Sequence, residues 1–266
     1  MPTPVALTIA GSDSSGGAGI QADLKTFAAC GVYGASAITA LTAQNTSGVT
    51  GVFPIPAGFV TEQIDAVFGD LDVGAVKIGM VSQQDVIAAI AAGIARWTPK
   101  HVVLDPVMVA TSGDRLLAPE AVEALRATLI PLADLITPNL PEAAALLDAA
   151  IAASETEIEA QGRRLLALGC KAVLIKGGHG TGAQSIDYFV TSDATLALPA
   201  PRVETRNTHG TGCSQSSAIA AALAKGEPLE RAVQFGKAYV SAAIEAADRF
   251  TVGHGHGPVH HFHKYY

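Results

Sequence analysis

The sequence predicts an α/β fold with a mainly parallel central sheet and helices on both of its faces. Short apolar runs alternate with segments of helical spacing along most of the chain, an order that is typical of this class. Hydrophobic residues make up 49% of the chain and charged residues only 15%. The apolar residues lie in short Ala- and Val-rich segments, as expected for strands buried on both faces. No apolar run reaches the roughly 18 residues that span a membrane.

The first half of the chain alternates apolar runs with amphipathic segments. In residues 58–71, for example, large apolar side chains recur at helical spacing. A glycine-rich loop, residues 11–19, follows the first apolar run. The predicted elements are, in order, a strand over 5–10, a helix over 20–30, strands over 32–40 and 49–55, a helix over 58–71, a strand over 75–78, a helix over 83–97 and a strand over 101–104.

The second half continues the alternation and carries clearer helix boundaries. Pro119 suits the first turn of a helix, Ser154 and Glu157 have the spacing of a capping box, and Gly226 separates the last two helices. The predicted elements are a helix over 119–129, a strand at 135–136, a helix from Pro141, a helix over 154–169, a strand over 172–176, a hairpin of strands 186–190 and 194–198, and helices over 213–225 and 229–250. No linker or repeat divides the chain, so a single domain over 1–266 is expected.

Charge and cysteine usage exclude several functional classes. The net charge is −7, so the chain has no basic footprint for nucleic acid or an anionic membrane. Cys30, Cys170 and Cys213 are far apart and predict reduced thiols in the cytoplasm. The N-terminus lacks the basic region and long apolar stretch of a signal peptide. Histidines cluster in the tail over 254–263, but their spacing fits neither a protease motif nor a zinc finger.

The segment 207–213, NTHGTGC, is the strongest candidate for binding chemistry. It immediately precedes a predicted helix, and Gly210 and Gly212 allow backbone N–H groups to turn toward one point. The positive end of the helix dipole adds to this effect, so Gly210, Thr211 and Gly212 could bind a phosphate. A tight turn with a helix cap is the alternative. The loop is not a Walker A motif, and no GxGxxG follows the first strand.

Cys213 lies in the first turn of that helix. A helix N-terminus lowers the pKa of a thiol and stabilises the thiolate, which favours a reactive cysteine. The commoner fate of a lone cysteine is that of a small buried hydrophobic residue. Both interpretations stay open from the spacing alone.

Charged side chains follow three of the predicted strands. Lys176 ends a strand before the glycine-rich loop 177–182 and could reach a nucleotide phosphate, or be an ordinary polar strand end. Asp105 and Glu142 each follow a strand. Paired carboxylates near a phosphate site hold Mg²⁺ through water, although each could equally be a helix cap or an ion-pair partner.

Taken together, these segments resemble the hydroxymethylpyrimidine/phosphomethylpyrimidine kinase family of the ribokinase superfamily. Any one segment is weak evidence, but the matching segments follow one another in register over nearly the whole chain. They are IAGSDSSGGAGIQAD (9–23), TAQNT (42–46), KIGM (77–80), DPVM (105–108), TPNLPE (137–142), KGGH (176–179), NTHGTGC (207–213) and the tail GHGPVHHF (255–262).

The resemblance implies a three-layer α/β/α ribokinase-like fold and a homodimer. The implied activity is ATP-dependent phosphorylation of 4-amino-5-hydroxymethyl-2-methylpyrimidine to its monophosphate and then to its diphosphate, in thiamin synthesis. Phosphoryl transfer needs positioning and charge stabilisation, which the amides of residues 210–213 would supply. Many ribokinase relatives carry an aspartate base at the position of Cys213, so the thiolate would accept the hydroxymethyl proton or pack beside it.

The resemblance also implies roles for further residues. Gln44 carries a donor and an acceptor that can pair with an aminopyrimidine. Asp23 and the backbone around Gly11 would contact the amine or hydroxyl of the substrate, and Met80 and Val107 would form apolar walls. Asp105, Asn139 and Glu142 would organise Mg²⁺ and its waters, while Lys176, Thr208 and Lys237 would face ATP.

Two other functions compete with this one. Some relatives with the same cysteine loop phosphorylate pyridoxal with help from a second, lid cysteine, but residues 107–113 contain no cysteine. A non-catalytic pyrimidine-binding module would keep Gln44 and the apolar walls yet lose the phosphate-handling groups. Lys176, Glu142 and the loop at 210–213 are all present, which disfavours such a module.

Overall fold

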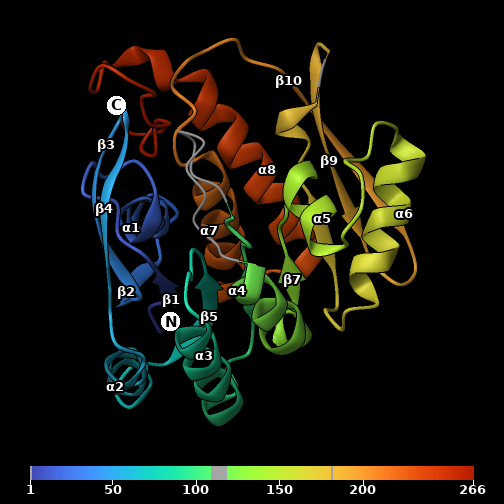
Figure 1. Ribbon diagram of the computed structural model, residues 1–266. Coiled ribbons are helices and arrows are strands. Elements are labelled where there is room, and N and C mark those ends of the chain that lie inside the picture. Colours follow the sequence, from blue (N-terminus) through green and yellow to red (C-terminus); the bar gives the residue numbers. More distant parts are fainter. Residues whose placement is uncertain (1, 109–118, 181) are drawn as a thin grey trace.

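The computed structural model describes residues 2–108, 119–180 and 182–266 (Figure 1). Its main sheet has the strand order β10-β9-β8-β7-β6-β5-β1-β2. All neighbours from β8 to β2 pair parallel, while β9 and β10 form an antiparallel hairpin at one edge. The strands are β1 (Val5–Ala10), β2 (Tyr33–Ile38), β5 (Val73–Ile78), β6 (Val102–Leu104), β7 (Leu135–Ile136), β8 (Val173–Ile175), β9 (Gln184–Val190) and β10 (Thr195–Pro201). The predicted mainly parallel sheet and the predicted hairpin are confirmed.

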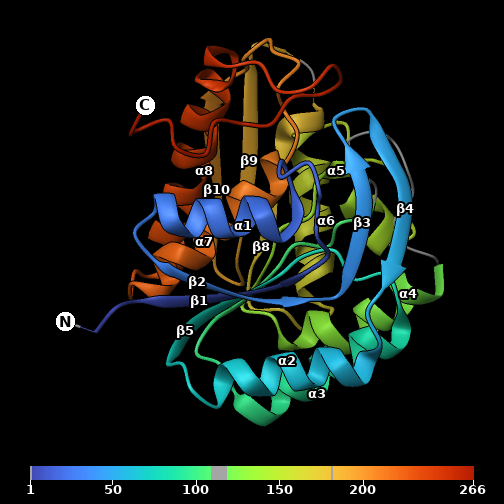
Figure 2. The same ribbon diagram turned by 90° about the vertical axis from the view of Figure 1, so that its left-hand side faces the viewer.

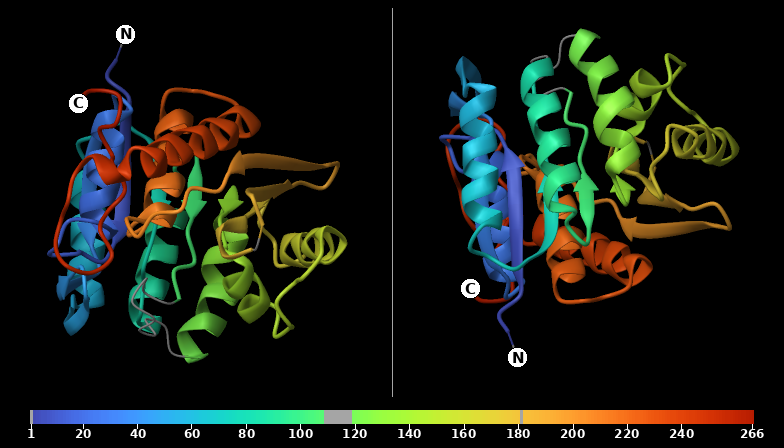
Figure 3. Two further views of the ribbon diagram at one scale, coloured as in Figure 1. Left: turned by 90° about the horizontal axis from the view of Figure 1, so that it is seen from above. Right: turned by 90° about the horizontal axis from the view of Figure 1, so that it is seen from below.

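Helices cover both faces of this sheet and make three layers (Figure 3). One face carries α1 (Gly19–Ala29), α7 (Thr211–Ala224) and α8 (Leu229–Glu245). The other carries α2 (Ala57–Phe68), α3 (Gln84–Trp97), α4 (Pro119–Ala124), α5 (Leu140–Leu146) and α6 (Glu155–Leu166). Beyond α4 the chain continues through a π-helical turn (Leu125–Leu129) and a 3₁₀ turn (Ile130–Leu132).

The sequence of the central strands explains why two layers of helix can pack on them. In β1, which is buried along its whole length, Leu7 and Ile9 face the layer of α2 and α3, whereas Ala6 faces the layer of α7. Strand side chains alternate between faces, so large residues fill one side and small ones the other. The small side chains of β1 and β5 let the Ala-rich helix α7 lie close to the sheet.

The predicted strand over 32–40 corresponds to β2, which ends at Ile38, but the strand that follows it is missing from the sequence prediction. After β2, the strand β3 (Ala40–Asn45) leaves the main sheet and pairs antiparallel with β4 (Gly48–Pro54) (Figure 2). Polar residues alternate through β3, and Ser12 of the loop after β1 binds its backbone. The separate hairpin therefore stands over the carboxyl ends of the central strands.

The last helix is shorter than the predicted range of 229–250. It ends at Glu245 and is followed by a 3₁₀ turn, Ala247–Arg249. Asp248 in that turn accepts hydrogen bonds from Thr205 and Asn207, which draws the chain toward the loop before α7. Within the described ranges, no helix is long and apolar enough to cross a membrane.

Candidate active site

A cavity of about 710 Å³ lies at the carboxyl ends of the parallel strands, where ligands bind in open α/β sheets. The loop after β1, the β3–β4 hairpin, the loops after β5 to β8 and the N-terminus of α7 all contribute to its wall. Every predicted site residue except Asp23 lines it. These are Gly11, Gln44, Met80, Asp105, Val107, Asn139, Glu142, Lys176, Thr208, Gly210, Thr211, Gly212, Cys213 and Lys237.

Asp23 does not reach the cavity, so the predicted contact with the substrate is wrong for this residue in the structure. Its carboxylate is fully buried and accepts hydrogen bonds from Thr8, Ser217 and the ammonium of Lys77. Both oxygens are thereby occupied. Asp23 lies on the inward face of α1, which the sequence motif alone does not distinguish from the face toward the substrate.

The loop before α7 has the geometry that the glycine spacing predicts. Gly210 adopts a left-handed conformation with φ of 79° and ends the loop at the start of the helix. It also approaches the backbone oxygen of Gly17 so closely that a Cβ could not fit. The Thr211 hydroxyl donates to the carbonyl of Thr208 over 2.7 Å. The first amides of an α-helix lack intrahelical acceptors, so those of Gly212 and Cys213 are suited to bind an anion at this wall of the cavity.

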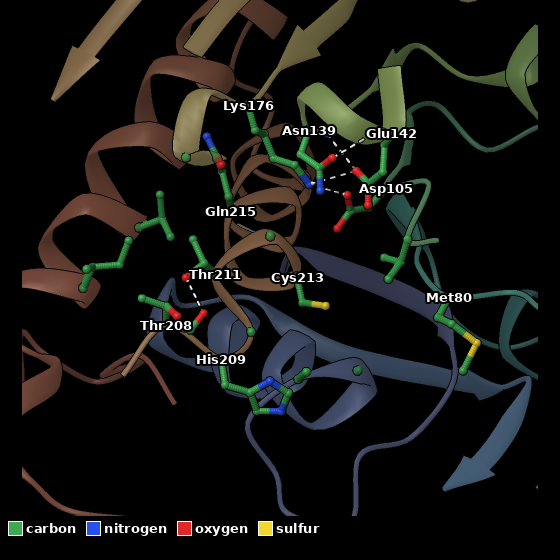
Figure 4. A pocket seen from close by; sticks show the side chains of 18 of the residues that line it. Met80, Asp105, Asn139, Glu142, Lys176, Thr208, His209, Thr211, Cys213 and Gln215 are labelled. Carbon is green, nitrogen blue, oxygen red and sulfur yellow. Dashed lines mark hydrogen bonds and ion pairs between the residues drawn. The ribbon is translucent and has the colours of Figure 1, made fainter. Parts of the chain in front are cut away.

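Lys176 lies between two carboxylates beside this loop (Figure 4). Its Nζ is 2.7 Å from Oδ1 of Asp105 and 4.0 Å from Oε2 of Glu142. Thr137 and Ser216 donate to the same Asp105 carboxylate. Burial alone would raise the pKa of Asp105, but Lys176, Lys77 and the hydrogen bond from Thr137 hold it below its usual range. The cluster therefore keeps a positive and a negative charge together at the cavity wall.

Glu142 serves as a helix cap as well as a neighbour of Lys176. Its carboxylate accepts from the backbone N–H of Asn139, and the Asn139 side chain accepts from the backbone N–H of Glu142. The two residues form a capping box at the start of α5. Burial raises the pKa of Glu142 to about 7, against the opposing effect of Lys176. The capping and ion-pair alternatives are both realised here.

The thiol of Cys213 lines the cavity, and of the two open interpretations the electrostatics favour the protonated thiol over a stabilised thiolate. Burial raises the pKa of Cys213 to about 11. The ammonium of Lys77 opposes this rise, while the carboxylates of Asp23 and Asp105 reinforce it. The desolvation of the thiol and the two carboxylates together outweigh the effect of Lys77. Cys213 is therefore protonated at neutral pH in the unliganded protein.

Lys237 enters the same cavity from α8 and is held by a residue that the sequence reasoning missed. Asp187, buried in β9, accepts from Lys237 over 2.9 Å, from Gln215 over 2.7 Å and from the backbone N–H of Gly177 over 2.9 Å. An aspartate inside an otherwise apolar predicted strand is the signal that could have found it. Asp187 fixes the start of the glycine-rich loop and the lysine on one side of the cavity.

Gln44 lies at the opposite end, on the β3–β4 hairpin. Its backbone N–H donates to Oγ of Ser14, and its Oε1 accepts from Thr42. The loop after β1 therefore holds the strand that carries Gln44. Met80 and Val107 line the cavity as well. The amide of Gln44, the apolar side chains of Met80 and Val107 and the charged cluster around Lys176 thus line one continuous cavity.

The fold and this cavity define a small-molecule kinase of the ribokinase-like class. A lysine, buried carboxylates and a helix N-terminus meet at the carboxyl edge of a parallel sheet, which is the arrangement that phosphoryl transfer needs. The chain belongs to the phosphomethylpyrimidine kinase family, whose family model matches residues 13–260.

Individual relatives agree with this assignment. The chain is 60% identical to a hydroxymethylpyrimidine/phosphomethylpyrimidine kinase of Rhizobium meliloti, over 99% of each chain. Among solved structures, it resembles the phosphomethylpyrimidine kinase of Clostridium difficile (46% identity, TM-score 0.80, 90% of this chain and 98% of that one). It also resembles an ADP complex of Bacillus subtilis pyridoxal kinase (38% identity, TM-score 0.91, 98% of both chains).

Proposed function

We propose that the protein phosphorylates 4-amino-5-hydroxymethyl-2-methylpyrimidine to its monophosphate and then to its diphosphate, with ATP as the phosphoryl donor. The observation that carries the proposal is the continuity of one cavity. Gln44 and the apolar side chains of Met80 and Val107 line it together with Lys176 and the start of α7. An aminopyrimidine could pair with the amide while its hydroxymethyl group points toward the phosphate-handling residues.

The residues around Lys176 suit the charge that develops in the transfer. The amides of Gly212 and Cys213 would donate to the transferred phosphoryl group, and Lys176 and Lys237 would contact the phosphates of ATP. We infer that Thr208 and Asn139 complete this end of the site.

The donor set also fits Mg²⁺, which retains water and binds through one or two carboxylates together with substrate phosphates. Asp105 and Glu142 supply two carboxylates, and within the described ranges no group of three or more ligating side chains could hold a metal ion by itself. Asp105 and Glu142 would therefore hold the ion through water, with Asn139 beside them. When bound, Mg²⁺ would neutralise phosphate charge.

Cys213 is the cavity residue proposed to take the proton of the acceptor hydroxyl. Because the thiol is protonated in the unliganded protein, this role requires that the thiolate forms once the substrates are bound. Cys213 lies in the first turn of α7, beside the amides proposed to bind the phosphoryl group, so its thiol would contact the reacting atoms. Replacement of Cys213 tests the role directly, as described below.

Pyridoxal kinase activity is the second candidate, and the similarity to the Bacillus subtilis enzyme favours it. Residues 107–113 contain no cysteine, which disfavours this activity, but residues 109–113 lie outside the described part of the chain, which ends at 108 and resumes at 119. The Gln44 amide, which suits an aminopyrimidine, supports the first candidate.

The proposal includes a homodimer in the cytoplasm. Leu41, Val52 and Phe53 on the β3–β4 hairpin are exposed apolar side chains, and Phe59 and Tyr33 of neighbouring elements are exposed as well. Leu41 and Phe53 lie opposite each other across the hairpin, and neighbouring exposed apolar side chains are typical of a surface that another chain covers. All three cysteines are free, which supports a reducing compartment. Sedimentation of wild type and Phe53→Lys tests the dimer, since a wild-type monomer would contradict it.

The proposed activity is tested by incubating the purified protein with the pyrimidine, ATP and Mg²⁺ and following products by mass spectrometry. The expected result is the monophosphate first and the diphosphate afterwards. ATP hydrolysis without any phosphorylated pyrimidine would contradict the proposal.

A further inference from the structure

Asp13 is buried in the loop after β1 and binds five donor groups. Its Oδ1 accepts from the backbone N–H and the hydroxyl of Ser15, at 2.9 and 2.7 Å. Its Oδ2 accepts from the backbone N–H groups of Gly17 and Ala18, at 3.1 and 2.8 Å. Nε2 of His209 lies 2.7 Å from the same oxygen. The carboxylate therefore stabilises its own loop and also contacts His209, which is far away in the sequence.

The loop that contains Asp13 is joined to the hairpin that carries Gln44. The backbone N–H of Thr42 donates to the Ser12 hydroxyl over 3.2 Å, and the Thr42 hydroxyl donates to the Ser12 carbonyl over 2.9 Å. The backbone N–H of Gln44 donates to Oγ of Ser14 over 2.8 Å. The loop and β3 consequently form one body at the pyrimidine end of the cavity.

His209 belongs to the opposite side of the cavity. It directly precedes Gly210, which begins the anion-binding loop, and Figure 4 shows its ring beside the start of α7. Gly17 lies so close to the ring that a Cβ would be 2.4 Å from it. The contact between Asp13 and His209 thus joins the pyrimidine end to the phosphoryl end.

The C-terminal tail joins the same two bodies a second time. The backbone N–H of His209 donates to the carbonyl of Gly257 over 3.0 Å, and the N–H of Val259 donates to the carbonyl of His209 over 3.2 Å. Farther back, the N–H of His256 donates to the carbonyl of Thr46, at the tip of the hairpin. The histidine-rich tail therefore closes a ring of contacts around one side of the cavity.

We propose that Asp13 and His209 are positioning residues, whose hydrogen bond sets the separation between the pyrimidine-binding hairpin and the anion-binding loop. This inference rests on the proposed function. The pair acts through the loops it joins and leaves the chemistry to other groups. A displacement of reacting groups by about 1 Å can cost on the order of 10²-fold in rate, so a single hydrogen bond at this junction is enough to matter.

The protonation of the pair supports this geometry. Burial alone would raise the pKa of Asp13, but its hydrogen bonds to His209, Ser15 and Ala18 lower that pKa to about 2. The carboxylate is ionised at neutral pH and accepts every hydrogen bond. His209 must then carry its proton on Nε2 to donate to Asp13.

Two substitutions of His209 form a matched pair that tests the proposal. In His209→Gln the side-chain amide can donate from nearly the position of Nε2, whereas His209→Met fills similar space and cannot donate. We expect His209→Gln to stay within about threefold of wild-type kcat and His209→Met to lose about 10- to 100-fold. The KM for ATP should change by less than about twofold in both, because Lys176 and Lys237, the proposed contacts to the ATP phosphates, lie on other elements and are held by Asp105 and Asp187. Equal kcat in the two variants would overturn the proposal.

A double-mutant cycle with Asp13→Asn shows whether Asp13 and His209 act together or contribute independently. If the residues act together, the double variant with His209→Met should be no slower than the slower single variant. Multiplicative losses would overturn the proposal, as would a fall in ATP affinity parallel to the fall in kcat.

Amide hydrogen exchange gives a readout that does not depend on turnover. The hydrogen-bonded amides of Thr211, Ser214 and Val259 should lose protection in His209→Met and keep it in His209→Gln, while the unfolding free energies of the two variants stay similar. Unchanged protection in both would contradict the proposal. The wild-type assay tests the proposed function by itself, so a failure of that function remains distinguishable from a failure of the positioning pair.

Discussion

The ammonium of Lys77 lies 2.8 Å from Oδ2 of Asp23, and both side chains are fully buried. Thr8 and Ser217 also donate hydrogen bonds to the Asp23 carboxylate. Residues of β1, β5, α1 and α7 therefore meet at this ion pair. Burial alone would lower the pKa of Lys77, but Asp23, Cys213 and Asp105 raise it, and the lysine stays charged. Ser217 is one helical turn beyond Cys213, so the pair lies against the inward face of α7.

Asp23→Asn should therefore act on stability and spare substrate recognition. Removing one partner of a buried pair leaves an uncompensated charge, which costs about 3–5 kcal/mol. Urea unfolding measures this loss, and the KM for the pyrimidine should be unchanged in the folded protein. The double variant Asp23→Leu with Lys77→Met, which removes both charges, is the control and should recover much of the stability. A large rise in KM at unchanged stability would contradict this account.

Gln44→Leu should weaken use of the pyrimidine far more than use of ATP. A substrate group left without its partner costs about 1–3 kcal/mol, so kcat/KM for the pyrimidine should fall by about 10- to 100-fold. Gln234→Leu, at an exposed position on α8, is the matched control. Steady-state kinetics with each substrate varied in turn give the comparison, and unchanged kcat/KM for the pyrimidine would remove Gln44 from the recognition site.

The raised pKa of Cys213 predicts slow alkylation in the unliganded protein at neutral pH. Because the thiolate is the nucleophile and the pKa is about 11, the rate with iodoacetamide should rise about tenfold per pH unit up to about pH 10. Peptide mapping separates Cys213 from Cys30 and Cys170, whose pKa values burial also raises to about 11. A rate that levels off near pH 8 would show a stabilised thiolate instead.

Cys213→Ala should keep both substrates bound and slow the transfer. Loss of a general base costs roughly 10²–10⁴-fold in rate, whereas loss of a packing group alone would change kcat little. Comparing kcat with the two KM values distinguishes these roles. A small change in kcat would leave the helix amides as the main source of catalysis.

Gly212→Val should abolish activity without unfolding the protein. A Cβ at Gly212 would lie 3.0 Å from Nζ of Lys176 and 3.6 Å from Oδ2 of Asp105, so the larger side chain displaces the lysine and fills the anion site. Gly58→Ala is the control, because a Cβ there meets nothing within 4 Å. Turnover and far-UV circular dichroism check the two variants, and wild-type turnover in Gly212→Val would contradict the assignment of the loop.

The sequence predicts most of the framework because the central strands are apolar along their whole length and the loops begin at glycine, proline or capping residues. The strand β3 is missing from the prediction because polar residues alternate through it and no turn signal separates it from β2. Asp23 was misplaced because a motif lists residues without saying which face of the helix they occupy. Asp187 was missed because a buried ion pair depends on partners far away along the chain, here Lys237 and Gln215.

The direction of the Cys213 pKa shift could not be predicted from the sequence either. The helix N-terminus is visible in the spacing of residues 210–213, but the raised pKa depends on desolvation and on Asp23 and Asp105, which only the folded chain brings near the thiol. The contact between Asp13 and His209 could not be predicted from the sequence either, because it joins two glycine-rich loops that only the folded chain brings together.

The most direct test of the account is a competition in which the purified protein receives equal amounts of the hydroxymethylpyrimidine and pyridoxal with limiting ATP and Mg²⁺. Mass spectrometry follows both sets of products over time. The account predicts the pyrimidine monophosphate and then its diphosphate as the dominant products. Dominant pyridoxal phosphate with little phosphorylated pyrimidine would contradict it and would reassign the Gln44 end of the cavity.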